Sequence, residues 1–206
     1  MKAAYVNAIG GASGDMLLAS LVDAGLDVAR LSLALTSVGI EGFQLEALVE
    51  ARRGVKGTHL NVNIDRSDPG KRTPADFIGI VNAAPISESS KSKCCEVFNL
   101  IGEAEGSVHG EDPGKVHLHE LGTADTIIDV VGVVLGLEML SVDKLYSSPI
   151  PTGSGTVRTE HGLLPVPAPA TAYMLASKNI PCYPPPSYMP STGEMVTPTG
   201  MALLAT

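Results

Sequence analysis

The sequence predicts a mixed α+β fold, in which a strand–glycine turn–helix unit is followed by helices that pack on a mixed or antiparallel sheet. Two alternating segments, 43–50 and 55–64, have the pattern of paired strands, with a turn at 52–54 between them. Other segments repeat apolar residues every three or four positions, which is typical of helices. The 206 residues, 44% of them hydrophobic, suffice for one domain or for two subdomains, 1–110 and 111–206.

The first half of the chain is predicted to begin with a strand at 3–8. The glycine-rich turn 10–14 then leads into a helix from about Asp15 to Gly25, with Ser13 as a cap candidate. The further elements expected here are a helix behind Asp27 that ends at Gly39, a loop at 66–72, a short helix at 74–83 after Thr73, and a longer helix from Ser87 to Gly110.

The second half is predicted to contain a short strand at 116–121 and a helix at 124–140 that is apolar almost all round. The remaining elements are a strand at 145–150, a helix at 170–177, an extended proline-rich run at 181–190 and a helix that begins after Thr197. Because no stop signal follows that last helix, the chain is expected to be part of something longer, and the alternative is a docked terminal helix.

Composition excludes some classes of function. The chain has 14 Lys and Arg against 22 Asp and Glu, no Trp and only 4% aromatic residues, so nucleic-acid binding is not expected. The N-terminal apolar run is too short for a signal peptide or a membrane span. Cys94, Cys95 and Cys182 cannot build a disulfide framework, and a cytoplasmic location is expected.

The segment His117-Leu118-His119-Glu120 is the sharpest local signal for a metal site. On a strand, residues two apart point to the same face roughly 6.5 to 7 Å from each other, so two imidazoles could converge on one ion. Histidine is a common ligand of nickel, zinc and copper. The alternative is a pair of solvent-facing histidines on an edge strand.

The following helix favours the metal interpretation. Asp129 and Glu138 are its only charged residues between 127 and 140, and nine positions place them on opposite faces, so one carboxylate must point inward. A buried carboxylate needs a cation or strong donors. Asp125 lies on the face of Asp129, and together with the histidines the two would form a nitrogen and oxygen cluster. The alternative is that Asp125 serves the helix N-terminus and Asp129 is exposed.

Two glycine-rich turns are candidate anion sites. Gly10, Gly11, Ser13, Gly14 and Asp15 connect a strand to a helix, where backbone N–H groups can hold a phosphate. This turn lacks the lysine of a Walker A motif, and Asp15 could simply favour the first helical turn.

A second such turn contains Gly153 and Gly155, followed by His161. The alternative interpretation of this segment is a mobile loop.

An ordered set of motifs across nearly all 206 residues resembles the LarC nickel-insertion proteins. The motifs are Gly10-Gly11-Ala-Ser-Gly14-Asp15-Met16, Glu105 with Val108-His109-Gly110, His117-Leu-His119-Glu120-Leu-Gly122-Thr-Ala-Asp125-Thr-Ile-Ile-Asp129, His161-Gly-Leu-Leu-Pro165-Val-Pro167-Ala-Pro169 and Thr197-Pro198-Thr199-Gly200. One stretch departs from the family, because 65–72 lacks the histidine-rich sequence that many members carry there.

The resemblance implies a cytoplasmic, nickel-inserting enzyme of the lyase class. It would insert Ni²⁺ into a pyridinium bisthiocarboxylic acid mononucleotide to complete the nickel pincer cofactor of lactate racemase-type enzymes. CTP, with Mg²⁺ or Mn²⁺, would bind a C-terminal portion beyond residue 206, and a homo-oligomer is expected.

The resemblance also makes one set of residues the candidate metal site. These residues are His117, His119, Glu120, Asp125 and Asp129. Glu120 or His119 would be the base that takes a proton from the pyridinium carbon. Gly10, Gly11, Ser13, Gly14, Asp15, Gly153, Gly155 and His161 would hold the nucleotide.

Two other functions are compatible with the motifs. A metal-dependent hydrolase can also use His-x-His at a strand end, but it would need further histidine ligands, and only His161 follows. A nickel-binding carrier module would bind the metal and consume no nucleotide.

Overall fold

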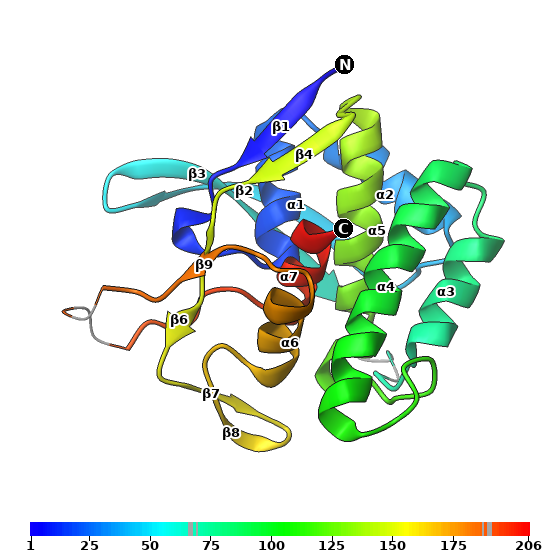
Figure 1. Ribbon diagram of the computed structural model, residues 1–206. Coiled ribbons are helices and arrows are strands. Elements are labelled where there is room, and N and C mark those ends of the chain that lie inside the picture. The colour runs from blue at the N-terminus through cyan, green and yellow to red at the C-terminus, as the bar shows by residue number, and fades with distance from the viewer. Residues whose placement is uncertain (66–67, 69, 187, 189–190) are drawn as a thin grey trace.

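Helix α5 (Ala124–Met139) lies at the centre of the helices in the computed structural model (Figure 1). The structure describes residues 1–65, 68, 70–186, 188 and 191–206. Helices α1, α2, α4 and α7 all pack against α5, so a helix that is apolar on nearly every side is buried on nearly every side. The other helices are α1 (Gly14–Asp23), α2 (Val28–Ser37), α3 (Pro74–Ala83), α4 (Glu88–His109), α6 (Pro169–Ser177) and α7 (Pro198–Ala205).

The predicted helices are confirmed to within about two residues at each end, and local capping explains where most of them begin. The side chains of Asp27, Ser87 and Thr197 accept hydrogen bonds from the first turns of α2, α4 and α7, and Thr73 forms a capping box with Asp76 at α3. Ser13 occupies the cap position of α1 but makes no capping bond, because its hydroxyl donates to the carboxylate of Asp15 instead.

The described strands form five two-stranded sheets, two parallel and three antiparallel, which confirms a mixed α+β fold. The pairs are β1 (Ala3–Val6) with β4 (Lys144–Ser147), β2 (Phe43–Arg52) with β3 (Val55–Ile64), β5 (Ile150–Pro151) with β9 (Cys182–Tyr183), β6 (Gly153–Ser154) with β10 (Gly193–Glu194), and β7 (Thr156–Thr159) with β8 (Gly162–Pro165). The first and third pairs are parallel.

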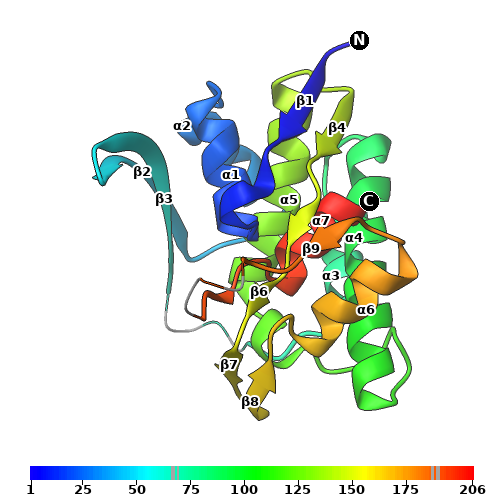
Figure 2. The same cartoon turned by 60° about the vertical axis from the view of Figure 1, so that its left-hand side comes forward.

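The long β2–β3 hairpin matches its prediction closely. Arg53 and Gly54 both have positive φ angles, 52° and 85°, which build the tight turn. Strand β3 packs against α1, and the tip of the hairpin extends away from the helices (Figure 2).

The prediction of a strand at 116–121 is wrong. Val116 and Leu118 are buried while His117 is exposed, so the segment alternates as a strand does. However, His119 has a φ of 45° and begins the short 3-10 helix η2 (His119–Leu121). A second such helix, η1 (Ala8–Gly10), follows β1.

Four other predicted segments differ from the structure or lie partly outside the described residues. The strand expected at 145–150 is divided into β4 and β5. The loop expected at 152–156 contains β6 and the start of the β7–β8 hairpin. Of the loop at 66–72 and the proline-rich run at 181–190, residues 66, 67, 69, 187, 189 and 190 lie outside the described residues.

Across the described ranges, no helix combines the length and apolar character needed to cross a bilayer.

Candidate functional site

Three histidines meet where three elements approach one another. His109 is the last residue of α4, His119 is the first residue of η2, and His161 lies in the turn of the β7–β8 hairpin. One ring nitrogen from each histidine lies within 4.8 Å of one ring nitrogen from each of the other two. The end of α4 and the β7–β8 hairpin both lie along the lower edge of Figure 1.

Backbone conformation places each of these rings. Gly110 takes a left-handed φ of 70° and ends α4 directly after His109. The positive φ of His119 turns its side chain away from the face of its neighbour His117. His161 is held in a two-residue hairpin turn, where its N–H donates to the hydroxyl of Thr159 at 3.1 Å.

Two glutamates, Glu105 and Glu120, lie at the histidines, and a third, Glu194, lies near Glu120. The Oε2 atom of Glu105, one helical turn before His109, lies 3.4 Å from His109 Nε2. Burial raises the pKa of Glu105, and the nearby His119 and His161 act in the opposite direction. Glu120 accepts a 2.8 Å hydrogen bond from the backbone N–H of Glu160, which ties η2 to the β7–β8 turn. Burial and the negative charge of Glu120 raise the pKa of Glu194 on β10.

Two ring nitrogens in this cluster are buried without a partner. His109 Nε2 and His119 Nδ1 make no hydrogen bond to any described residue, and the 3.4 Å approach of Glu105 Oε2 to His109 Nε2 is an ion-pair contact only. Buried polar atoms are normally satisfied, so these two nitrogens are available to a ligand. Three imidazoles beside carboxylate oxygens are a donor set for a borderline divalent ion such as nickel or zinc. We call His109, His119 and His161 the histidine cluster.

The structure brings together only part of the metal site predicted from the sequence. His119 belongs to the histidine cluster, and Glu120 lies beside it. His117 is exposed and close to Asp76, whose pKa it helps to lower behind the larger contributions of Thr73 and Arg72. His117 and His119 therefore do not point toward one ion, because they would share a face only if the segment were a strand. His117 as a ligand stays a prediction without geometric support.

Sequence reasoning from residue types alone missed His109 and Glu105 as site residues. Their signal was available, because a glutamate and a histidine four positions apart share one face of a helix. Nothing local in the sequence indicated that this face meets the β7–β8 turn.

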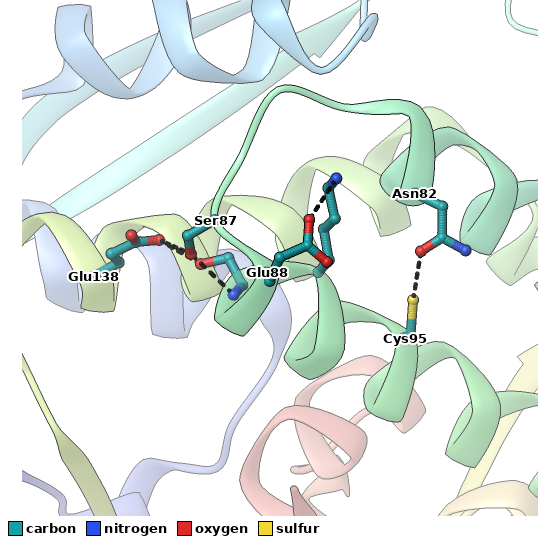
Figure 3. Close-up of polar contacts among 7 residues, drawn as sticks. Asn82, Ser87, Glu88, Cys95 and Glu138 are labelled. Carbon is teal, nitrogen blue, oxygen red and sulfur yellow. Dashed lines mark hydrogen bonds and ion pairs between the residues drawn. The ribbon is translucent and has the colours of Figure 1, made fainter.

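Asp125 and Asp129 lie in a different cluster. Asp129 is the inward carboxylate of α5, with an exposure of 4%, whereas Glu138 is exposed and accepts hydrogen bonds from Ser87 and Ser90 (Figure 3). Burial raises the pKa of Asp129 to about 8, and the negative charges of Asp125 and Asp15 add to this shift. We call Asp15, Asp125 and Asp129 the aspartate cluster.

The glycines of both predicted anion sites are explained by close packing. A side chain at Gly14 would collide with the carboxylate of Asp129, and one at Gly11 would collide with the carbonyl of Met195. A side chain at Gly153 would meet the carbonyl of Gly193, and one at Gly155 would meet Ser191. Gly10 has open space around it. Anion binding by these turns stays a prediction.

Comparison with known proteins places this geometry in context. Residues 4–206 match the family model described as nickel insertion protein. The chain is 42% identical over 206 residues to a relative from Dictyoglomus thermophilum whose name places it among nickel insertion proteins, covering 100% of this chain and 52% of that relative. It is 38% identical over 204 residues to the pyridinium-3,5-bisthiocarboxylic acid mononucleotide nickel insertion protein of Desulfitobacterium hafniense strain DCB-2, covering 99% and 49%.

The chain spans about half the length of the curated relatives it matches. No solved structure matches it.

Proposed function

The chain belongs to the nickel insertion protein family, and we propose that it takes part in inserting nickel into pyridinium-3,5-bisthiocarboxylic acid mononucleotide. The observation that carries this proposal is the histidine cluster, with two buried ring nitrogens that have no described partner. Nickel is the cargo of this reaction, and the cluster is where the chain would hold it before transfer.

The donor set suits transient holding. Imidazole binds nickel well, and the absence of a thiolate cage in the cluster keeps the ion exchangeable. His161 is exposed and lies in a hairpin turn, so one ligand can leave without disturbing the helices. The Oε2 atom of Glu105 lies 3.4 Å from His109 Nε2, the nitrogen offered to nickel, so Glu105 would contribute an oxygen ligand beside that ring.

Formation of the carbon–nickel bond requires a base. The electron pair of a pyridinium C–H bond becomes the carbon–nickel bond, and the proton passes to a protein group. Glu120 and His119 are the candidates from the sequence, and Glu120 is preferred here because His119 would be engaged with nickel. Glu194, whose pKa is raised by burial and by Glu120, is a second carboxylate able to take up that proton.

The finer parts of the function belong to the same proposal. They are completion of the nickel pincer cofactor of lactate racemase-type enzymes, lyase chemistry, and consumption of CTP with Mg²⁺ or Mn²⁺ at a site in a C-terminal portion. A nickel carrier without turnover and a metal-dependent hydrolase are the competing functions, since three histidines are also a zinc-enzyme donor set.

Calorimetric titration with nickel tests the proposal, with zinc and manganese as comparison metals. We expect His109→Ala and His161→Ala to weaken nickel binding at least tenfold, while His59→Ala, on the β2–β3 hairpin, and His117→Ala leave it unchanged. Circular dichroism confirms that each variant is folded.

Unchanged nickel affinity in both His109→Ala and His161→Ala would contradict the proposal. Loss in His117→Ala would restore the sequence-based ligand set. Preferential zinc binding, together with hydrolysis of a phosphate ester or an amide, would favour the hydrolase.

A further inference from the structure

The aspartate cluster contains a buried carboxylate that the histidine cluster does not use. Asp129 is 4% exposed, and its Oδ1 atom is buried with no hydrogen-bond partner among residues 1–65, 68, 70–186, 188 and 191–206. Its other oxygen lies against Gly14, where no side chain would fit. The backbone N–H of Asp15 is the one group found to favour the charged form of Asp129.

The neighbouring charges make this arrangement costly without a ligand. Asp15 and Asp125 are the charged groups that act on Asp129, and Asp15 also acts on Asp125. All are acidic, so each opposes ionisation of the others. A buried carboxylate is normally paired with a cation or donors, and this one faces two further carboxylates instead.

We propose that Asp15, Asp125 and Asp129 hold a hard divalent cation, Mg²⁺ or Mn²⁺, which binds the phosphate of a nucleotide. Oxygen donors are those that these ions prefer, whereas nickel favours the imidazoles of the histidine cluster. In the described structure the aspartate oxygens do not form a compact donor group like that of the histidine cluster, so one or two of the three carboxylates would contact the ion directly and the rest would act through bound water. An open set fits Mg²⁺, which keeps several waters and is bound through one or two carboxylates together with phosphate.

The position at the start of α1 favours the same ligand. Asp15 is in the first turn of this ten-residue helix, where the helix dipole and free N–H groups stabilise an anion. A phosphate bound to the cation would therefore be attracted by both the metal and the helix.

One short segment links the two clusters. The negative charge of Glu120, beside the histidine cluster, acts together with burial on Glu194, and Val196, two residues after Glu194, pairs with Ala12 in the glycine turn. The N–H of Ala12 donates to Met195 at 2.9 Å. A pyridinium mononucleotide has a ring for nickel and a phosphate for the second cation, so this part of the inference rests on the proposed function.

Electron paramagnetic resonance of Mn²⁺ tests the inference on the 206-residue chain, with and without inorganic phosphate. We expect Asp129→Asn and Asp15→Asn to weaken Mn²⁺ binding at least tenfold and to abolish the gain in affinity produced by phosphate. Glu138→Gln is the matched control, because it removes an exposed carboxylate from the other end of the same helix α5. It should bind Mn²⁺ as the unchanged chain does.

Separate outcomes decide the two proposals. His161→Ala should lose nickel and keep Mn²⁺, and Asp129→Asn should do the reverse. Absence of Mn²⁺ binding, or unchanged binding in both aspartate variants, would overturn the aspartate site. Loss of Mn²⁺ in His161→Ala would also overturn it, because the ion would then share the histidine cluster. Mn²⁺ binding that depends on the aspartates, without nickel binding at the histidines, would refute the proposed function alone.

Discussion

Asp129 is the buried carboxylate of helix α5, and its environment couples its protonation to folding. Its pKa is about 8 in the folded protein, against an ordinary value of 3.8, because of burial and the charges of Asp125 and Asp15. The folded state therefore keeps a proton that the unfolded state releases. The stabilisation from this proton is complete below about pH 4 and is lost as the pH rises through about 8.

The variant Asp129→Asn should remove this dependence. In a metal chelator, we expect the free energy of unfolding of the unchanged chain to fall relative to Asp129→Asn by a few kcal/mol between about pH 4 and pH 8, with no further divergence above that. Urea denaturation at several pH values measures the difference. Parallel stability curves for the two proteins would show that Asp129 titrates normally.

Glu105 would share the ion with His109, because its Oε2 atom lies 3.4 Å from His109 Nε2. We expect Glu105→Gln to weaken nickel binding about tenfold, because a neutral amide would replace the charged carboxylate beside His109 Nε2. Glu103→Gln, an exposed neighbour on the same helix, is the control and should bind normally. Equal affinities in calorimetry would remove Glu105 from the site.

At the scale of elements, the packing of helix α4 depends on a close backbone contact at a glycine as well as on its apolar face. Gly102 lies in the interior of this helix and is buried against the carbonyl of Pro113 and the ring of Pro74. This contact holds the chain as it returns from the end of α4 toward η2, and those two elements carry His109 and His119.

Two glycine substitutions in helix interiors should therefore have opposite effects on the stability of the protein. Gly102→Ala should destabilise the protein by about 1 to 3 kcal/mol, because the new methyl group meets backbone that cannot move aside. Gly79→Ala, on the exposed face of α3 with open space around it, should stabilise it by about 0.5 to 1 kcal/mol. Thermal denaturation compares them, and shifts of the same sign would contradict this explanation.

At the scale of the whole molecule, one hydrophobic cluster joins both halves of the chain. It contains Leu18 and Phe98 from the first half as well as Ile128 and Met201 from the second. Helix α5 packs against α1, α2 and α4 across residue 110.

Because of this shared core, we expect the chain to unfold in a single transition. Scanning calorimetry should give equal calorimetric and van't Hoff enthalpies. Two transitions would instead support the predicted subdomains 1–110 and 111–206. The expected homo-oligomer and cytoplasmic location also stay predictions.

The sequence by itself determined most local structure, because helix periodicity, caps and turn glycines act over a few residues. Thr73, Ser87 and Thr197 were recognisable as caps, and the opposite placement of Asp129 and Glu138 followed from helix geometry alone. The prediction of a strand at 116–121 was wrong because alternation of buried and exposed residues occurs both in strands and in irregular chain that passes over a core.

Tertiary structure decided the composition of the two clusters. His109, His119 and His161 come from three elements, and Asp15 meets Asp129 only because α1 crosses α5 at Gly14. Local pattern could place each side chain on its own element, but not choose its partners. Those partners are set by packing of the whole core, which lets His119 face His161 while leaving His117 at the surface.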